Sequence, residues 1–167
     1  MKINIKNLSN KQRSIKAKND LQLFTKDAVI KMNLENDINE IRIIYKKEFY
    51  NFYKKNQQFL GFKKLYNNKI VTIILARNWD MSQEVRKSAI IHELTHVKQI
   101  ATKKIILNKD FSDIKYKGKV FPMWKNYSNK KFNTLEKKDY SIARRYFEKH
   151  FPWEREVDKN VQKYNLD

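Results

Sequence analysis

Two histidines and a glutamate stand close together in the middle of the sequence. The segment His92-Glu93-Leu94-Thr95-His96 has the form H-E-x-x-H and uses two of the three His of the chain. Residues four apart share one face of a helix, so both imidazoles can reach one metal ion. The Glu93 carboxylate can then take a proton from a metal-bound water. A shuffled chain of this composition would contain about 0.002 such matches, so we predict a zinc site.

A catalytic zinc ion usually takes three protein ligands and a water, so the motif needs a further ligand. Metzincin peptidases supply a third His, but the positions where they have Gly and His are here Gln99 and Thr102. The next His along the chain is His150. We therefore expect the third ligand to come from a later part of the chain.

Acidic residues stand on a predicted C-terminal helix, which begins at Pro152. Glu154 and Asp158 are four residues apart and share a helix face. Glu154 can bind the metal, while Asp158 can accept an N–H from a ligand histidine. Glu156 and His150 are the alternative third ligands. Acidic residues in a first helical turn also stabilise a helix without any metal.

The motif requires a helix, and the surrounding pattern predicts one from Ser82 to about Lys103. Asp80 or Ser82 can cap its start, and apolar residues at helical spacing give it a buried face. The fold class is therefore α+β, with a small antiparallel or mixed sheet packed on this long helix. Periodicity and turn residues predict the other elements, which are a helix over 20–32, a strand over 41–45, a hairpin of strands 61–66 and 69–76, a helix over 141–149 and the helix from Pro152.

The 167 residues are enough for one domain, which we expect over 1–167. Within it, 1–19 is expected to be an N-terminal arm, with a short strand or a loose segment over 1–10. Residues 104–138 are expected to be a basic, loop-rich insertion with one short strand. The absence of Cys excludes disulfides, thiolate zinc sites and cysteine nucleophiles.

The longest apolar stretch, 70–76, is too short to span a bilayer, and no apolar segment near Met1 reads as a secretory signal. We expect a cytoplasmic protein without a membrane partner. If a phage encodes it, the expected location is the host cytoplasm or the virion.

The chain is strongly basic, with a net charge of +19. Of its 37 cationic residues, 30 are Lys, and 101–138 carries 11 Lys against three acidic residues. Lysines neutralise phosphates without reading sequence, which favours non-specific contact with nucleic acid or an acidic assembly. An AT-rich coding sequence also enriches Lys and Asn without selection for binding. Both explanations of the charge stay open.

The two motifs together resemble the short gluzincin-type zinc metallopeptidases of bacteriophage and bacterial genomes. In those proteins H-E-x-x-H-x-x-Q is followed by P-W/Y-E-x-E-A on a C-terminal helix, and this chain has HELTHVKQ and PWEREVD. The resemblance implies a minimal zincin-like domain in which His92, His96 and Glu154 bind zinc. It implies Glu93 as general base and Asp158 as a supporting carboxylate. Val157 replaces the usual Ala.

We therefore expect a zinc-dependent peptidase that hydrolyses peptide bonds by Glu-assisted attack of a zinc-bound water. Its partner is a peptide or protein substrate, which the strand over 69–76 can bind as an added strand. The alternative is a basic structural or accessory protein of a phage or nucleoprotein assembly with a retained or vestigial zinc site. The residues that can stabilise the oxyanion are Tyr127, Tyr140, Tyr146 and His150.

Overall fold

The computed structural model describes residues 1–6, 11–46, 69–76, 83–107, 113–122 and 127–164. The fold is α+β, as predicted. Where one domain is predicted, the chain divides into two compact units, Met1–Lys98 with Asn160–Asp167, and Gln99–Lys159.

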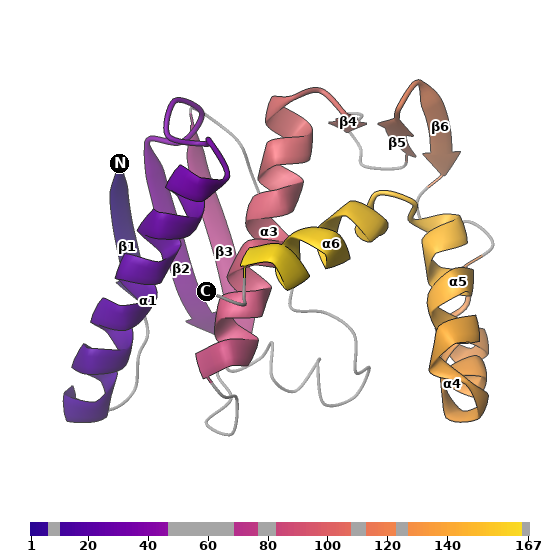
Figure 1. The fold of residues 1–167 in the computed structure, drawn as a ribbon, viewed down its shortest axis with the longest axis horizontal. Helices are drawn as coiled ribbons and strands as arrows, with labels where there is room; N and C mark the ends of the chain where they lie inside the picture. Colours follow the sequence, from indigo (N-terminus) through magenta and orange to yellow (C-terminus); the bar gives the residue numbers. More distant parts are fainter. Residues whose placement is uncertain (7–10, 47–68, 77–82, 108–112, 123–126, 165–167) are drawn as a thin grey trace. The chain divides into compact units, whose positions relative to one another are not determined.

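Among the described residues, the first unit contains a three-stranded sheet in the order β1-β2-β3, whose strands pair in parallel where an antiparallel or mixed sheet is expected (Figure 1). Its strands are β1 (Lys2–Lys6), β2 (Glu40–Lys46) and β3 (Ile70–Ala76). Helix α1 (Lys11–Lys31) connects β1 to β2, as parallel pairing requires. The register aligns Ile3 with Ile41 and Val71, and Ile5 with Ile43 and Ile73. Apolar side chains therefore form rows on one face of the sheet.

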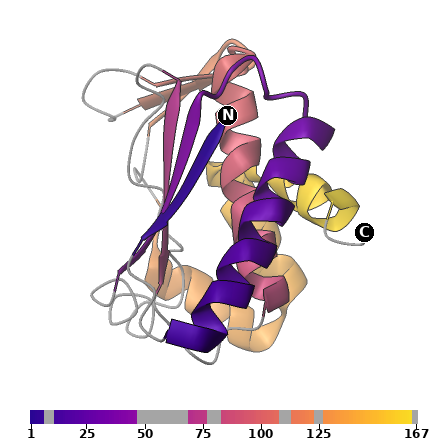
Figure 2. The same ribbon diagram turned by 90° about the vertical axis from the view of Figure 1, so that its left-hand side faces the viewer.

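Helices α1 and α3 (Gln83–Ala101) cover that face, and Figure 2 shows both on the same side of the sheet. Ile41, Ile43 and Ile73 are fully buried, as are Ile90 and Leu94 of α3. The core of the first unit consists of Ile5, Leu21, Ala28, Val29, Met32, Leu34, Ile38, Ile41, Ile43, Val71, Ile73, Ala89, Ile90, Ile91, Leu94 and Val97.

Several predicted elements of this unit are confirmed, with shifted ends. The strand predicted over 41–45 is β2, and the helix predicted over 82–103 is α3. Helix α1 begins at Lys11 instead of about residue 20. Of the N-terminal arm expected over 1–19, the short strand is present as β1, and residues from Lys11 onward are helical. The first strand of the predicted hairpin, 61–66, and the caps at 80 and 82 lie outside the described residues.

The second unit contains a small antiparallel sheet and two helices. The sheet consists of β4 (Ile105–Leu107), β5 (Asp113–Tyr116) and β6 (Lys119–Pro122), in that order. Helices α4 (Asn129–Lys138) and α5 (Tyr140–His150) follow. Where a loop-rich insertion with one short strand is expected over 104–138, the described residues of that segment include three strands and helix α4. Each strand has only three or four residues, and the Lys residues between the apolar ones conceal the alternation.

Helix α6 (Glu154–Tyr164) is the predicted C-terminal helix. Trp153, which precedes the helix, and Val157 are buried, and Val161 and Tyr164 pack against the core of the first unit. No helix among the described residues is long and apolar enough to cross a lipid bilayer.

The turn between β5 and β6 consists of Lys117 and Gly118. Tyr116 pairs with Lys119, so the hairpin loop has two residues, and both have positive φ, 48° and 82°. Positive φ at both positions is typical of a type I′ turn, which favours Asn-Gly. Lys117 thus occupies a backbone conformation that costs a lysine about 1 kcal/mol.

We predict that Lys117→Asn raises the free energy of unfolding by roughly 0.5–1 kcal/mol, because Asn tolerates the left-handed region better than Lys. Thermal denaturation of the full chain measures the change. Lys119→Asn is the charge-matched control, and it should stabilise nothing because Lys119 lies in β6. An equal gain from both variants would trace the effect to the lost charge.

Candidate metal centre

Helix α3 buries two opposite faces of different chemistry. At about 100° per residue, Ile90, Leu94 and Val97 lie within roughly 60° of one another on the face toward the sheet. His92, His96 and Gln99 lie within roughly 60° on the opposite side. Gln99 is fully buried and the two histidines are half-buried. The face of α3 that carries the two histidines and Gln99 is therefore largely shielded from solvent although its side chains are polar.

The two motif histidines approach each other as the spacing predicts. Their Nε2 atoms are 3.2 Å apart, and their rings meet edge to face with centroids 4.9 Å apart. One ring can donate its N–H to the other at this distance. Two nitrogens bound to one tetrahedral zinc at about 2.0–2.1 Å would lie roughly 3.3–3.4 Å apart. The observed spacing suits a shared ion with little side-chain movement.

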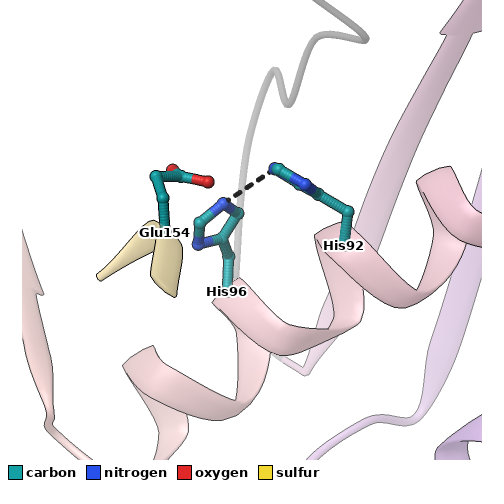
Figure 3. A group of neighbouring side chains, drawn as sticks. All are labelled: His92, His96 and Glu154. Atoms are coloured by element: carbon teal, nitrogen blue, oxygen red, sulfur yellow. Dashed lines mark hydrogen bonds between the residues drawn. The ribbon is translucent and has the colours of Figure 1, made fainter. Parts of the chain in front are cut away.

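Glu154 completes the group. It is the first residue of α6 and only 8% exposed, and its carboxylate lies close to the two imidazoles (Figure 3). One ligand atom from each of His92, His96 and Glu154 lies within 4.8 Å of the others, so the group could hold a metal ion. Two imidazole nitrogens and a carboxylate oxygen are a donor set that zinc accepts in catalytic sites. The residues present thus fit the ion that the sequence predicts.

Glu93, the predicted general base, is on the same helix and 2% exposed. It directly follows His92 in the chain. Burial of this kind lowers the local dielectric and strengthens electrostatic effects on a nearby water. Its catalytic role stays a prediction.

The alternative third ligands lie outside this group. Glu156 accepts hydrogen bonds from Lys104 Nζ at 2.6 Å and Gln99 Nε2 at 3.3 Å. His150 Nδ1 lies 2.9 Å from the Tyr146 carbonyl oxygen. Both side chains therefore have other partners.

Asp158, expected to support a ligand histidine, forms an ion pair with Arg144 of α5. Burial raises the pKa of Asp158, and neighbouring Glu154 and Glu148 raise it further, against the lowering effect of Arg144. Glu148 also contacts Arg155 at 2.9 Å, so paired charges join α5 to α6. The predicted contact of Asp158 with a histidine stays a prediction.

The residues considered for oxyanion stabilisation have different environments. Tyr127 stacks on Tyr146 with centroids 5.6 Å apart, and burial raises the pKa of Tyr127 to about 12. The Tyr146 hydroxyl accepts a hydrogen bond from the Ser128 backbone N–H. Tyr140 is 62% exposed. The geometry selects none of these side chains for the chemistry.

Comparison with known proteins finds no matching family model, no matching curated protein and no matching solved structure.

Sequence reasoning missed the side chains that hold α6. Gln99 Nε2 donates to the Trp153 carbonyl at 3.0 Å, and Asn160 Nδ2 donates to Thr95 Oγ1 at 3.2 Å. A helical projection could have found Gln99, because it shares a face with both histidines. Arg144 carried no comparable signal, since its pairing depends on how α5 and α6 pack.

The carboxylate of Glu156 gives a prediction about pH. Burial alone would raise the pKa of Glu156, but hydrogen bonds from Lys104 and Gln99 lower it overall. A lowered pKa means that its stabilising effect is fully present above the unfolded value of about 4.3 and is lost as the pH falls through the folded value.

We predict that Glu156→Gln lowers the stability of the metal-free protein at pH 7 by a few tenths to about 1 kcal/mol, as is typical of partly exposed ion pairs. The difference from the parent chain should shrink on acidification below about pH 4.3. Thermal melting in the presence of a chelator measures both. Glu35→Gln, at an exposed residue, is the control and should show no such trend. A difference independent of pH would contradict the prediction.

Proposed function

We propose that this protein is a zinc-dependent peptidase with a metal centre of His92, His96 and Glu154. The observation that carries the proposal is the convergence of these three donors, from the two motifs, within 4.8 Å. The Nε2–Nε2 spacing of 3.2 Å adds to it, because it is close to the edge of a zinc tetrahedron. We place the protein in the cytoplasm, or in the virion if a phage encodes it.

When bound, zinc would supply Lewis acidity and make water more acidic. His92 and His96 contribute neutral imidazole nitrogens, and Glu154 contributes a negative oxygen. Glu93 takes the proton of the attacking water and returns it to the leaving amine. The burial of Glu93 and Glu154 keeps bulk water from weakening these interactions. The substrate class that fits this chemistry is a peptide or protein.

The proposal predicts that the metal-free full chain takes up about one zinc ion, and that His92→Ala or His96→Ala abolishes the uptake. Glu154→Ala should weaken it strongly. Metal analysis after gel filtration measures the content. Full zinc occupancy after loss of both histidines would refute the site.

Glu93→Gln separates catalysis from metal binding within the same experiment. It should keep the zinc, because Glu93 is no ligand in this proposal, and lose about 10²–10⁴-fold in cleavage of casein. If the zinc-loaded parent protein cleaves no peptide bond, the alternative of an accessory protein with a retained site is favoured.

A second candidate function, contact with nucleic acid, rests on the small sheet of the second unit. Five exposed lysines surround this sheet: Lys103, Lys104, Lys115, Lys117 and Lys119. A backbone hydrogen bond of 3.3 Å from the Lys117 N–H to the Lys104 carbonyl brings the ends of two of its strands together. We propose that this basic surface contacts phosphates without base specificity.

If so, affinity for a DNA duplex falls with salt at a log–log slope of about 0.9 per phosphate contacted. Replacing Lys115, Lys117 and Lys119 by Gln should reduce the slope by up to about 2–3 units and leave cleavage intact. The charge-matched control replaces Lys130, Lys137 and Lys138 of α4. Equal losses from both triple variants would indicate general attraction by the net charge, and undetectable binding at physiological salt would favour the coding-bias explanation.

A further inference from the structure

Gln99 is a buried polar side chain whose position on α3 coincides with the histidine face. It lies three residues after His96 and seven after His92, and it is fully buried. A buried amide without hydrogen bonds is strongly unfavourable, so its partners are part of the structure. Those partners lie at the start of α6.

The first partner is the backbone carbonyl of Trp153, which accepts from Gln99 Nε2 at 3.0 Å. Trp153 directly precedes α6, and Glu154 is the first residue of that helix. The carbonyl therefore belongs to the peptide group that joins Trp153 to Glu154. By holding this planar group, Gln99 restrains the backbone from which the Glu154 carboxylate projects.

Other contacts make this anchor rigid. The Trp153 indole is 5% exposed and packs edge to face against Tyr116 and Phe121, with centroids 6.1 and 6.0 Å away. Gln99 Nε2 also lies 3.3 Å from Glu156 Oε2, whose carboxylate binds Lys104. The first turn of α6 is thus fixed through the Trp153 side chain, the Trp153 carbonyl and Glu156.

We propose that Gln99 is a positioning residue of the metal centre, which presets Glu154 for metal binding by holding the Trp153–Glu154 peptide. This inference rests on the proposed function, since it assumes that Glu154 is a ligand. A preset ligand loses less conformational freedom on binding, so the effect should appear in metal affinity. Gln99 itself needs no contact with the metal or the substrate.

The test compares Gln99→Met with Thr95→Val in the full chain. Met has nearly the same length but cannot donate a hydrogen bond. Thr95 is also fully buried and accepts from Asn160, six residues beyond Glu154. Each variant loses a hydrogen bond between α3 and the segment 153–160, but only Gln99→Met frees the peptide at Glu154.

Zinc affinity is measured by competition with a chromogenic chelator. We expect Gln99→Met to weaken zinc binding by about 10–100-fold, as for other residues that orient metal ligands. Thr95→Val should stay within about twofold of the parent chain. The melting temperature of each metal-free variant shows how much of the change in zinc affinity comes from a general loss of stability.

Cobalt(II) substitution supplies a spectroscopic readout. The visible absorption of the Gln99→Met protein should shift toward that of Glu154→Ala, because both disturb the same ligand. If Gln99→Met does not fold, Gln99→Asn carries the same expectation, since its amide is one methylene too short to reach the carbonyl.

The outcomes distinguish the two proposals. A parent chain that binds no zinc overturns the metal centre and this inference with it. A parent chain that binds zinc, with Gln99→Met at parental affinity or with Thr95→Val equally weakened, overturns only the positioning role of Gln99.

Discussion

The structure depends on a constraint on α3, which has to bury polar side chains on one face and apolar side chains on the other. Thr95 and Gln99 are both fully buried, so each needs a hydrogen-bond partner inside the protein. The Thr95 hydroxyl donates to the Ile91 carbonyl of α3 and accepts from Asn160 of α6, and Gln99 donates to the Trp153 carbonyl next to α6. These hydrogen bonds are directional, so they restrain the position of α6 along α3 in addition to apolar packing.

Charged side chains add a second set of restraints to the first turns of α6. Glu156 binds Lys104, Arg155 binds Glu148, and Asp158 binds Arg144. Each pair is at least partly exposed, so each contributes little stability by itself. Together they orient the helix about its own axis, because they lie on different sides of it. The carboxylates of this acidic segment thus have different roles, and only Glu154 joins the histidines.

The scarcity of glycine affects the turns. The chain has two Gly, and Asn33, Lys69, Lys103 and Lys117 have positive φ. Each of these positions is one where Gly would be unstrained. Lys103 follows the end of α3, where its N–H bonds to the Ile100 carbonyl at 2.9 Å, and Lys69 immediately precedes β3. Lysine thus occupies three backbone positions where glycine or asparagine is usual. This agrees with an AT-rich coding sequence that enriches Lys throughout the chain.

The sequence by itself determined the local features of this protein. The helix carrying His92 and His96, the strand β2 and the C-terminal helix follow from periods of 3.6 and 2 residues, and β3 follows from a short apolar run after a turn; none of these signals needs a distant contact. The meeting of the two histidines also follows, because residues four apart share a helix face. Of the short strands β4 to β6 the sequence predicts only one, and not its position, since three or four residues are too few to show a period among lysines.

Only the tertiary structure decided which later residue joins the histidines. Glu154, Glu156 and His150 were chemically acceptable in the sequence, and all lie more than 50 positions beyond His96. That grouping depends on where α6 starts and how it is rotated, and at its start Gln99 Nε2 donates to the Trp153 carbonyl at 3.0 Å. The pairing of Asp158 with Arg144 depends likewise on the packing of α5 against α6. Such contacts join residues far apart in the chain, and no local periodicity encodes them.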